Sequence, residues 1–269
     1  MSILITVIGL LIPFIGTTLG SALVYFFKDK GISPNLEKVF NGFAAGVMFS
    51  TSVFGLILPA TEYKTDYMPN ILVVVIGFAL GIGLLLLIDH LVDHIHSQGN
   101  YEEGIKVNSL NKTQKMFLAV LIHNIPEGLS TGVIFGVALA GLTGNEVDIW
   151  TAMSPALILS VGMAIQNIPE GTVVSLPFKE ELNSTNKAFG YGVATGAVEP
   201  IFAILGVVAT YFIELLMPWA LSFAAGCMIY VTIEDLVPTA IGTNQKNHFG
   251  LMAFLIGFVL MMVLDFTLG

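Results

Sequence analysis

His123-Asn124-Ile125-Pro126-Glu127-Gly128 lies inside a long apolar stretch of this chain, and Gln166-Asn167-Ile168-Pro169-Glu170-Gly171 lies inside the next one. The two motifs share the pattern Asn-Ile-Pro-Glu-Gly and begin 43 residues apart. A carboxylate inside an apolar span costs several kcal/mol unless something compensates it, so such a residue marks a functional site. Two carboxylates in one repeated pattern are therefore the feature from which fold and function are best read.

The composition is that of a membrane protein. Apolar residues make up 55% of the 269 residues and charged residues 11%, and the mean hydropathy is +0.86. A helix needs ~20 apolar residues to cross the hydrocarbon layer. Eight stretches approach that length, near 3–27, 36–60, 70–91, 114–140, 151–177, 187–213, 217–240 and 247–266. Apolar and polar residues do not alternate along them, which excludes barrel strands. We expect an all-α polytopic membrane protein, a single transmembrane domain over 1–269 with a loop at 92–113.

The lysines orient these spans. All ten basic residues are Lys, and nine of them fall at alternate connections, whereas Lys64 falls in the opposite set. By the positive-inside rule, those nine are cytoplasmic, which places both termini outside. No charged region with a cleavage site precedes the first stretch, so we expect residues 1–27 to be a retained helix. The small size and short loops favour a prokaryotic inner membrane.

A second internal similarity concerns the flanking spans. The second stretch contains Phe43-Ala44-Ala45-Gly46-Val47-Met48, and the seventh contains Phe223-Ala224-Ala225-Gly226-Cys227-Met228. In an eight-helix chain these two spans run in opposite directions. The pattern predicts an inverted repeat of helices 1–3 and 6–8 around central helices 4 and 5, as in many secondary transporters. A chance match between Gly- and Ala-rich helices is the alternative. The pair Gly77-x-x-x-Gly81 in the third stretch predicts a close helix–helix approach.

The motif side chains suit a divalent metal ion. His123 and Glu127 are four residues apart, as are Gln166 and Glu170, so each pair shares one helix face. The proline of each motif frees a backbone carbonyl one turn earlier. Glu199, beside a proline of the sixth stretch, adds a third carboxylate at a similar depth. Imidazole, carboxylate and amide ligands together favour Zn²⁺ and its neighbours Fe²⁺, Mn²⁺ and Co²⁺. The amides could instead hydrogen-bond a neighbouring helix.

With these residues the chain resembles the Zrt/Irt-like (ZIP) metal transporters, in the bacterial branch whose fourth and fifth spans carry HNxPEG and QNxPEG. The resemblance covers essentially the whole chain. It implies import of zinc or a related divalent ion, Cd²⁺ included, into the cytoplasm through a mid-membrane two-metal site. It also implies one site made of His123, Glu127, Gln166, Glu170 and Met48, and an adjoining one made of Asn124, Asn167 and Glu199, bridged by Glu127 and Glu170. Some relatives have an aspartate where this chain has Asn167, which leaves the second site less negative.

We hypothesise alternating access, in which helices 1, 4, 5 and 6 shift against helices 2, 3, 7 and 8 and the glutamates exchange protons for metal. A channel-like path is the alternative. A second acidic and histidine-rich cluster at the inner end of the third span is a candidate cytoplasmic metal site, made of Asp89, His90, Asp93, His94 and His96. Asp89 and Asp93 are four residues apart, as are His90 and His94, so we expect these pairs to stack along one helix face. A solvated helix end is the alternative there. Glu234 and Asp235 are candidates to line the inner vestibule.

Two other functions compete with transport. An intramembrane two-metal hydrolase would need a metal-binding catalytic motif such as HExxH, which does not occur in the sequence. A metal sensor would need a signalling domain. We therefore expect a transporter and no enzyme, with the metal ion as transported substrate, the lipid bilayer as partner and no organic cofactor. The net charge of −9 disfavours nucleic-acid binding. A single cysteine, Cys227, excludes an internal disulfide, and a homodimer is one option for the assembly.

Overall fold

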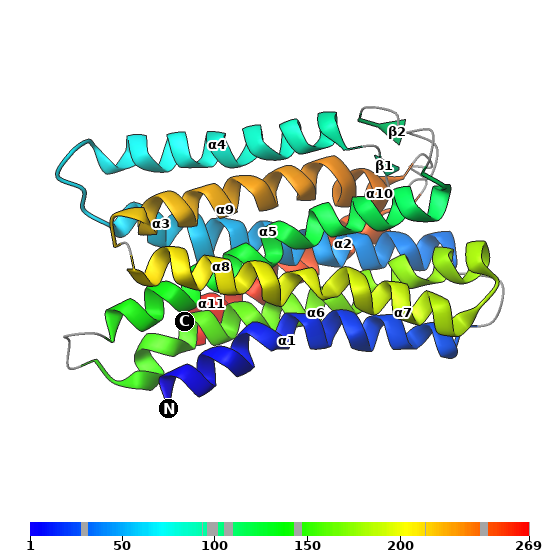
Figure 1. Cartoon of the computed structure of the whole chain (residues 1–269), viewed down its shortest axis with the longest axis horizontal. Coiled ribbons are helices and arrows are strands. Elements are labelled where there is room, and N and C mark those ends of the chain that lie inside the picture. Colours follow the sequence, from blue (N-terminus) through cyan, green and yellow to red (C-terminus); the bar gives the residue numbers. More distant parts are fainter. Residues whose placement is uncertain are drawn as a thin grey trace.

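The computed structural model describes residues 1–27, 32–92, 94–95, 102–104, 110–142, 147–212, 214–242 and 247–268. Long helices run side by side along one axis of the molecule (Figure 1). Within the described ranges, eight helical spans are long and apolar enough to cross a membrane. The expectation of an all-α polytopic membrane protein is confirmed, and the eight spans overlap the eight predicted stretches.

The helices are, in chain order, α1 (Ser2–Ala22), α2 (Pro34–Ser50), α3 (Leu58–Glu62), α4 (Asn70–Leu91), α5 (Lys112–Gly141), α6 (Ile149–Leu182), α7 (Thr185–Gly196), α8 (Val198–Phe212), α9 (Met217–Val231), α10 (Val237–Ile241) and α11 (Phe249–Leu268). Four short helical turns link some of them: the 3₁₀ turns η1 (Leu23–Tyr25) and η3 (Glu214–Leu216), and the π-helical turns η2 (Thr51–Ile57) and η4 (Thr232–Leu236). Each π turn continues an α-helix on both sides, so α2 to α3 and α9 to α10 each form one span.

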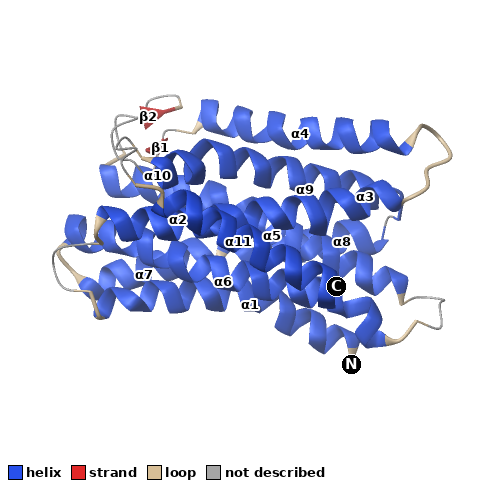
Figure 2. Ribbon diagram, turned by 180° about the vertical axis from the view of Figure 1, so that it is seen from behind, coloured by secondary structure: helices blue, strands red, loops and turns tan. Residues whose placement is uncertain are grey.

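Among the described residues, the β structure is one antiparallel hairpin with two residues in each strand. It consists of β1 (His94–Ile95) and β2 (Glu102–Glu103), and it lies at one end of the bundle (Figure 2). We call this end the hairpin end. The N- and C-termini lie toward the opposite end, which we call the terminus end (Figure 1).

Capping residues fix where the two motif-bearing helices begin. Asn111 and Gln114 form a capping box at the start of α5, with hydrogen bonds of 2.9 and 3.0 Å between each side chain and the other's backbone N–H. Asp148 accepts from the first backbone N–H groups of α6. Asn183 ends α6 in the left-handed conformation, with φ of 47°. These caps fix the ends of α5 and α6, and with them the height of each motif along the bundle axis.

Glycines let the helices pack backbone to backbone. A Cβ added at Gly171 of α6 would lie 2.4 Å from the Thr17 carbonyl oxygen of α1, and one at Gly128 of α5 would lie 2.3 Å from that of Glu199. The prediction of a close approach at Gly81 is confirmed, because a Cβ there would lie 2.1 Å from the Phe223 carbonyl oxygen of α9. Helices far apart in the sequence are thus held at fixed registers.

The packing pairs α1 with α6, α5 with α8, α2 with α11 and α4 with α9. Contacts match between the two segments that resemble each other: Gly46 packs on the carbonyl of Phe254, and Gly226 packs on that of Phe78. Each segment also leads into a π turn, where a hydroxyl donates to a methionine carbonyl at 2.7 Å. The inverted repeat stays a prediction, and these matched contacts are those that it would produce.

Candidate metal site

The two motifs lie in the middle of α5 and α6, which remain helical through Pro126 and Pro169. Pro200, the proline beside Glu199, coincides with a larger change in its own helical span. The sixth span is interrupted between α7 and α8, beside Glu199. The carbonyl oxygen of Thr195, in the last turn of α7, accepts a 3.0 Å hydrogen bond from the Asn124 side chain. The interruption thus ties α7 to the first motif.

The three amide side chains of the motifs are all held by their nitrogens. Asn124 Nδ2 donates to Thr195, and Gln166 Nε2 donates to Glu127 Oε1 at 2.9 Å. Asn167 Nδ2 lies 3.0 Å from Glu199 Oε2, 3.1 Å from Thr17 Oγ1 and 3.3 Å from the Pro13 carbonyl oxygen. Because each nitrogen is anchored to the protein, each amide turns its oxygen the other way.

Those oxygens are left without hydrogen-bond partners. Five buried oxygen atoms in the two motifs accept no hydrogen bond among the described residues: Asn124 Oδ1, Glu127 Oε2, Gln166 Oε1, Asn167 Oδ1 and Glu170 Oε2. A buried polar atom without a partner costs about 1–3 kcal/mol, and more if it is charged. A cation coordinated by these oxygens would supply the missing interaction.

The carboxylates are close enough to repel one another. Glu127 interacts electrostatically with both Glu170 and Glu199, and Glu127 and Glu199 are each only 1% exposed. No lysine lies between Lys115 and Lys179 in the sequence to neutralise them. Such a cluster of negative charge favours a divalent cation between its members.

Glu199 is held differently from the motif glutamates. Its Oε1 accepts a 2.6 Å hydrogen bond from the Thr17 hydroxyl, and its Oε2 accepts from Asn167. Thr17, on α1, was not a predicted site residue. A pair of threonines between Gly16 and Gly20 in an otherwise apolar span was the available signal, and glycine-flanked threonines are too common in membrane helices to be decisive.

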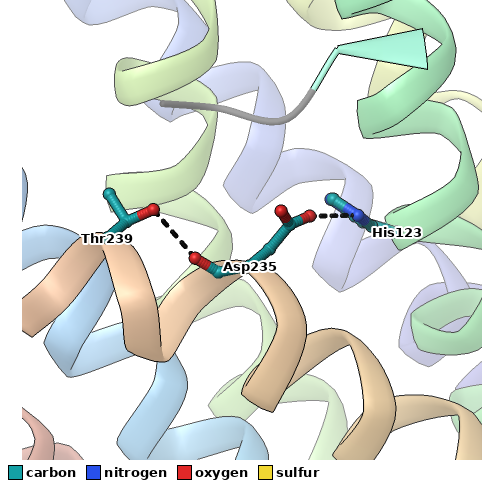
Figure 3. A network of polar contacts seen from close by, with 3 residues as sticks. All are labelled: His123, Asp235 and Thr239. Carbon is teal, nitrogen blue, oxygen red and sulfur yellow. Dashed lines mark hydrogen bonds and ion pairs between the residues drawn. The ribbon is translucent and has the colours of Figure 1, made fainter. Parts of the chain in front are cut away.

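His123 makes an ion pair through Nε2 with Oδ2 of Asp235, which belongs to the π turn η4 (Figure 3). The sequence predicted Asp235 only as a residue of the vestibule. Glu170 and Asp89 also act electrostatically on His123, so carboxylates from three other helical spans influence this imidazole.

The site is more accessible from one end of the bundle. His123 is one turn nearer the hairpin end than Glu127, and Glu170 is one turn nearer it than Gln166. His123 and Glu170 are partly exposed, whereas Glu127 and Gln166 are buried. Toward the terminus end, the same helices bury Phe135 and Met163 completely. The motif side chains nearer the hairpin end are thus the more exposed ones.

The donor set is mixed in character. Among the described residues, no three His, Cys, Asp or Glu side chains meet as a ready-made metal cluster. The amide oxygens therefore have to complete any coordination shell, and carboxylate, imidazole and amide oxygen together form a shell of borderline-to-hard ligands. Such a shell suits a divalent ion that must be released again.

Comparison with known proteins identifies the family of the chain. Residues 116–265 match the family model described as ZIP Zinc transporter. The chain belongs to the ZIP family. It is similar to the zinc transporter ZIP11 of Xenopus tropicalis, with 30% identity over 99% of this chain and 98% of the relative. It is also similar to the zinc transporter ZIPB of Bordetella bronchiseptica (32% identity, 98% and 81%) and to the zinc transporter GufA of Myxococcus xanthus (37% identity, 80% and 81%).

Met48, the candidate ligand on α2 of this ZIP protein, has the surroundings of an ordinary core residue. It is 1% exposed and belongs to the main apolar cluster, on α2, which packs against α6. Its carbonyl oxygen accepts a hydrogen bond from Ser52, next to the π turn η2. A buried methionine fills space well whatever else it does, so its role as a ligand stays a prediction.

The second candidate cluster is arranged differently from the prediction. We expected its residues to stack along one helix face, but α4 ends at Leu91 because Val92 is extended, with ψ of 124°. His94 falls in β1, so it cannot stack above His90 as it would in a helix. Asp89 is buried and His90 is exposed, which separates them as well. Asp93 and His96 lie outside the described residues.

Proposed function

We propose that this ZIP family protein carries zinc, or a related divalent ion such as Fe²⁺, Mn²⁺, Co²⁺ or Cd²⁺, into the cytoplasm through the two motifs. The observation that carries the proposal is the set of five buried oxygens without hydrogen-bond partners. All five belong to motif residues, and three of them are amide oxygens whose nitrogens are anchored elsewhere. Other buried polar atoms of the described residues, such as the Thr6 hydroxyl, also lack hydrogen-bond partners, and what distinguishes these five is that they are carboxylate and amide oxygens of two repeated motifs on neighbouring helices.

Two adjoining metal positions fit the polar contacts. The first uses His123, Glu127, Gln166 and Glu170, with Met48 as a further candidate, and the second uses Asn124, Asn167 and Glu199 with the same two motif glutamates. Glu199 already accepts two hydrogen bonds, and Asn167 is neutral. We therefore expect the second position to bind more weakly than the first.

The direction of transport is inferred from charge and exposure. Lys38, Lys115, Lys179 and Lys187 all belong to helix ends at the hairpin end, whereas Lys64 lies in the connection at the other end. The positive-inside rule then makes the hairpin end cytoplasmic. His123 and Glu170 are partly exposed on that side, so this conformation corresponds to one that releases metal inward.

Alternating access is supported by how the helices are grouped. The first group, α1 with α5 to α8, contains all motif residues, and its members pack mainly on one another. The second group contains α2 to α4 and α9 to α11. Fewer contacts join the groups, and they include α2 with α6 and α5 with α9. A shift of the first group against the second would move the site between the two sides.

Reconstituted liposomes loaded with a zinc-sensitive dye test the function. We expect saturable zinc entry that is lost in the double variant Glu127→Gln, Glu170→Gln. Because the glutamates must lose protons to bind metal, entry should also slow as the pH on both sides is lowered. A wild-type protein that binds zinc but never moves it would favour a sensor, and entry that is independent of pH would contradict proton exchange.

A further inference from the structure

Asp235 is a charged residue that contacts the first motif from the other group of helices. Its Oδ2 pairs with His123 Nε2, and the two side chains are 4% and 17% exposed (Figure 3). The pair joins α5, in the first helix group, to the π turn η4, in the second. Because both side chains are largely buried, the pair is not a chance contact on the surface.

The local backbone is built to present Asp235. The π turn spans Thr232–Leu236, between α9 and α10, and a π turn accommodates a residue that a regular helix could not place. Thr232 donates to the carbonyl oxygen of Met228 at 2.7 Å, and Thr239 donates to that of Asp235 at 2.8 Å. The Thr232 hydroxyl at the start of the turn and the Thr239 hydroxyl beyond its end thus hold it in place, and Figure 3 shows the contact between Thr239 and Asp235.

The contact determines which nitrogen of His123 is left for a metal. A ring nitrogen that faces a carboxylate carries a hydrogen, and a nitrogen that carries a hydrogen has no lone pair to donate. In the neutral imidazole, the lone pair is then on Nδ1. Metal-binding histidines commonly donate their other N–H to a carboxylate, which fixes the tautomer and the orientation of the ring.

We propose that Asp235 is a positioning residue of the metal site. It keeps the hydrogen on Nε2 of His123, so that the metal binds at Nδ1. The inference rests on the proposed function, because it presumes that His123 is a ligand. It adds a residue from the other helix group, so that the orientation of a ligand on α5 depends on how the two groups are docked.

Two measurements on the purified full-length protein, with Cd²⁺ as the probe, test the assignment. In ¹⁵N-histidine-labelled protein loaded with ¹¹³Cd²⁺, we expect metal–nitrogen coupling at Nδ1 of the ring whose signals vanish in His123→Ala. In a binding titration, we expect Asp235→Ala to weaken Cd²⁺ affinity about 10–100-fold. The same change made in His123→Ala protein should weaken it no further, because Asp235 acts only through His123.

Asp235→Asn, which keeps an oxygen acceptor of the same shape, should lose less affinity than Asp235→Ala and covers the case in which alanine disturbs folding. Glu181→Gln removes an exposed carboxylate at the hairpin end of α6 and should leave affinity unchanged. Metal–nitrogen coupling at Nε2 would overturn the proposal. An equal loss of Cd²⁺ affinity when Asp235→Ala is made in His123→Ala protein would also overturn it, since Asp235 would then be a direct ligand. If His123→Ala itself leaves affinity intact while Glu127→Gln abolishes it, the proposal fails but the transport site stands.

Discussion

At the scale of single residues, the motif amides act through both of their ends. Each nitrogen is bound to a protein acceptor, and each oxygen is left without a hydrogen-bond partner. In the proposed metal site, Asn and Gln would therefore add oxygen ligands without adding charge. Thr17 has a related role, since its hydroxyl holds Glu199 in place.

The hydrogen bond between Thr17 and Glu199 can be tested by removing the hydroxyl. Thr17→Val leaves Oε1 of a buried carboxylate without this donor, and hydrogen bonds to charged groups contribute about 1.5–3 kcal/mol. We expect a loss of that order in the free energy of unfolding, followed by denaturant titration in detergent. Thr6→Val is the matched control on α1, because the Thr6 hydroxyl is buried without a hydrogen-bond partner. Equal losses at both positions would contradict the role given to Thr17.

At the scale of helices, hydropathy and positional patterns predicted the spans well, and they could not predict the interruptions. An apolar run of the right length must become a helix in lipid, because every backbone polar group has to be satisfied internally. The π turns η2 and η4 leave no mark in the hydropathy, and Pro200 beside the break at Glu199 is a signal that Pro126 and Pro169 share without ending their helices, so the sequence alone could not locate these interruptions. The same is true of the end of α4 at Leu91, where the helical stacking predicted for the histidines was wrong.

Two glycines of α4, one packed against α9 and one with open space around it, allow a matched test of helix packing. Gly81 of α4 packs on the Phe223 carbonyl of α9, whereas an added Cβ at Gly83 would meet no atom within 4 Å. Gly81→Ala should therefore separate α4 from α9 and lower the melting temperature in detergent. Gly83→Ala should leave it unchanged or raise it, since alanine is favoured over glycine in a helix by about 1 kcal/mol. A Gly81→Ala protein as stable as the wild type would show that the helices do not pack this closely.

At the scale of the whole molecule, the sequence predicted the candidate site residues but not how they are held. The repeated motif pointed to Glu127 and Glu170 because uncompensated carboxylates are costly in lipid. The partners Thr17 and Asp235 come from α1 and η4, far away in the sequence, and only the packing of the bundle brings them to the motifs. The orientation of the bundle in the membrane stays a prediction that follows from the lysines.

Thiol labelling in intact cells tests that orientation. Lys64 and Lys187 are both exposed and lie at opposite ends of the bundle, Lys64 in the connection between α3 and α4 and Lys187 in the first turn of α7. A membrane-impermeant maleimide should label Lys64→Cys in intact cells and Lys187→Cys only after the membrane is opened. The native Cys227 is 1% exposed and serves as the unlabelled background. The reverse pattern would place the hairpin end outside and reverse the proposed direction of transport.

The central claim is that the buried motif oxygens hold the transported ion, and anomalous diffraction at the zinc edge tests it most directly. Crystals of the protein grown with zinc should give an anomalous peak in contact with Glu127 Oε2 and Glu170 Oε2, with a second, weaker peak toward Asn124 and Asn167. Peaks confined to the histidines near β1, with the motif oxygens bound only to protein or water, would contradict the account.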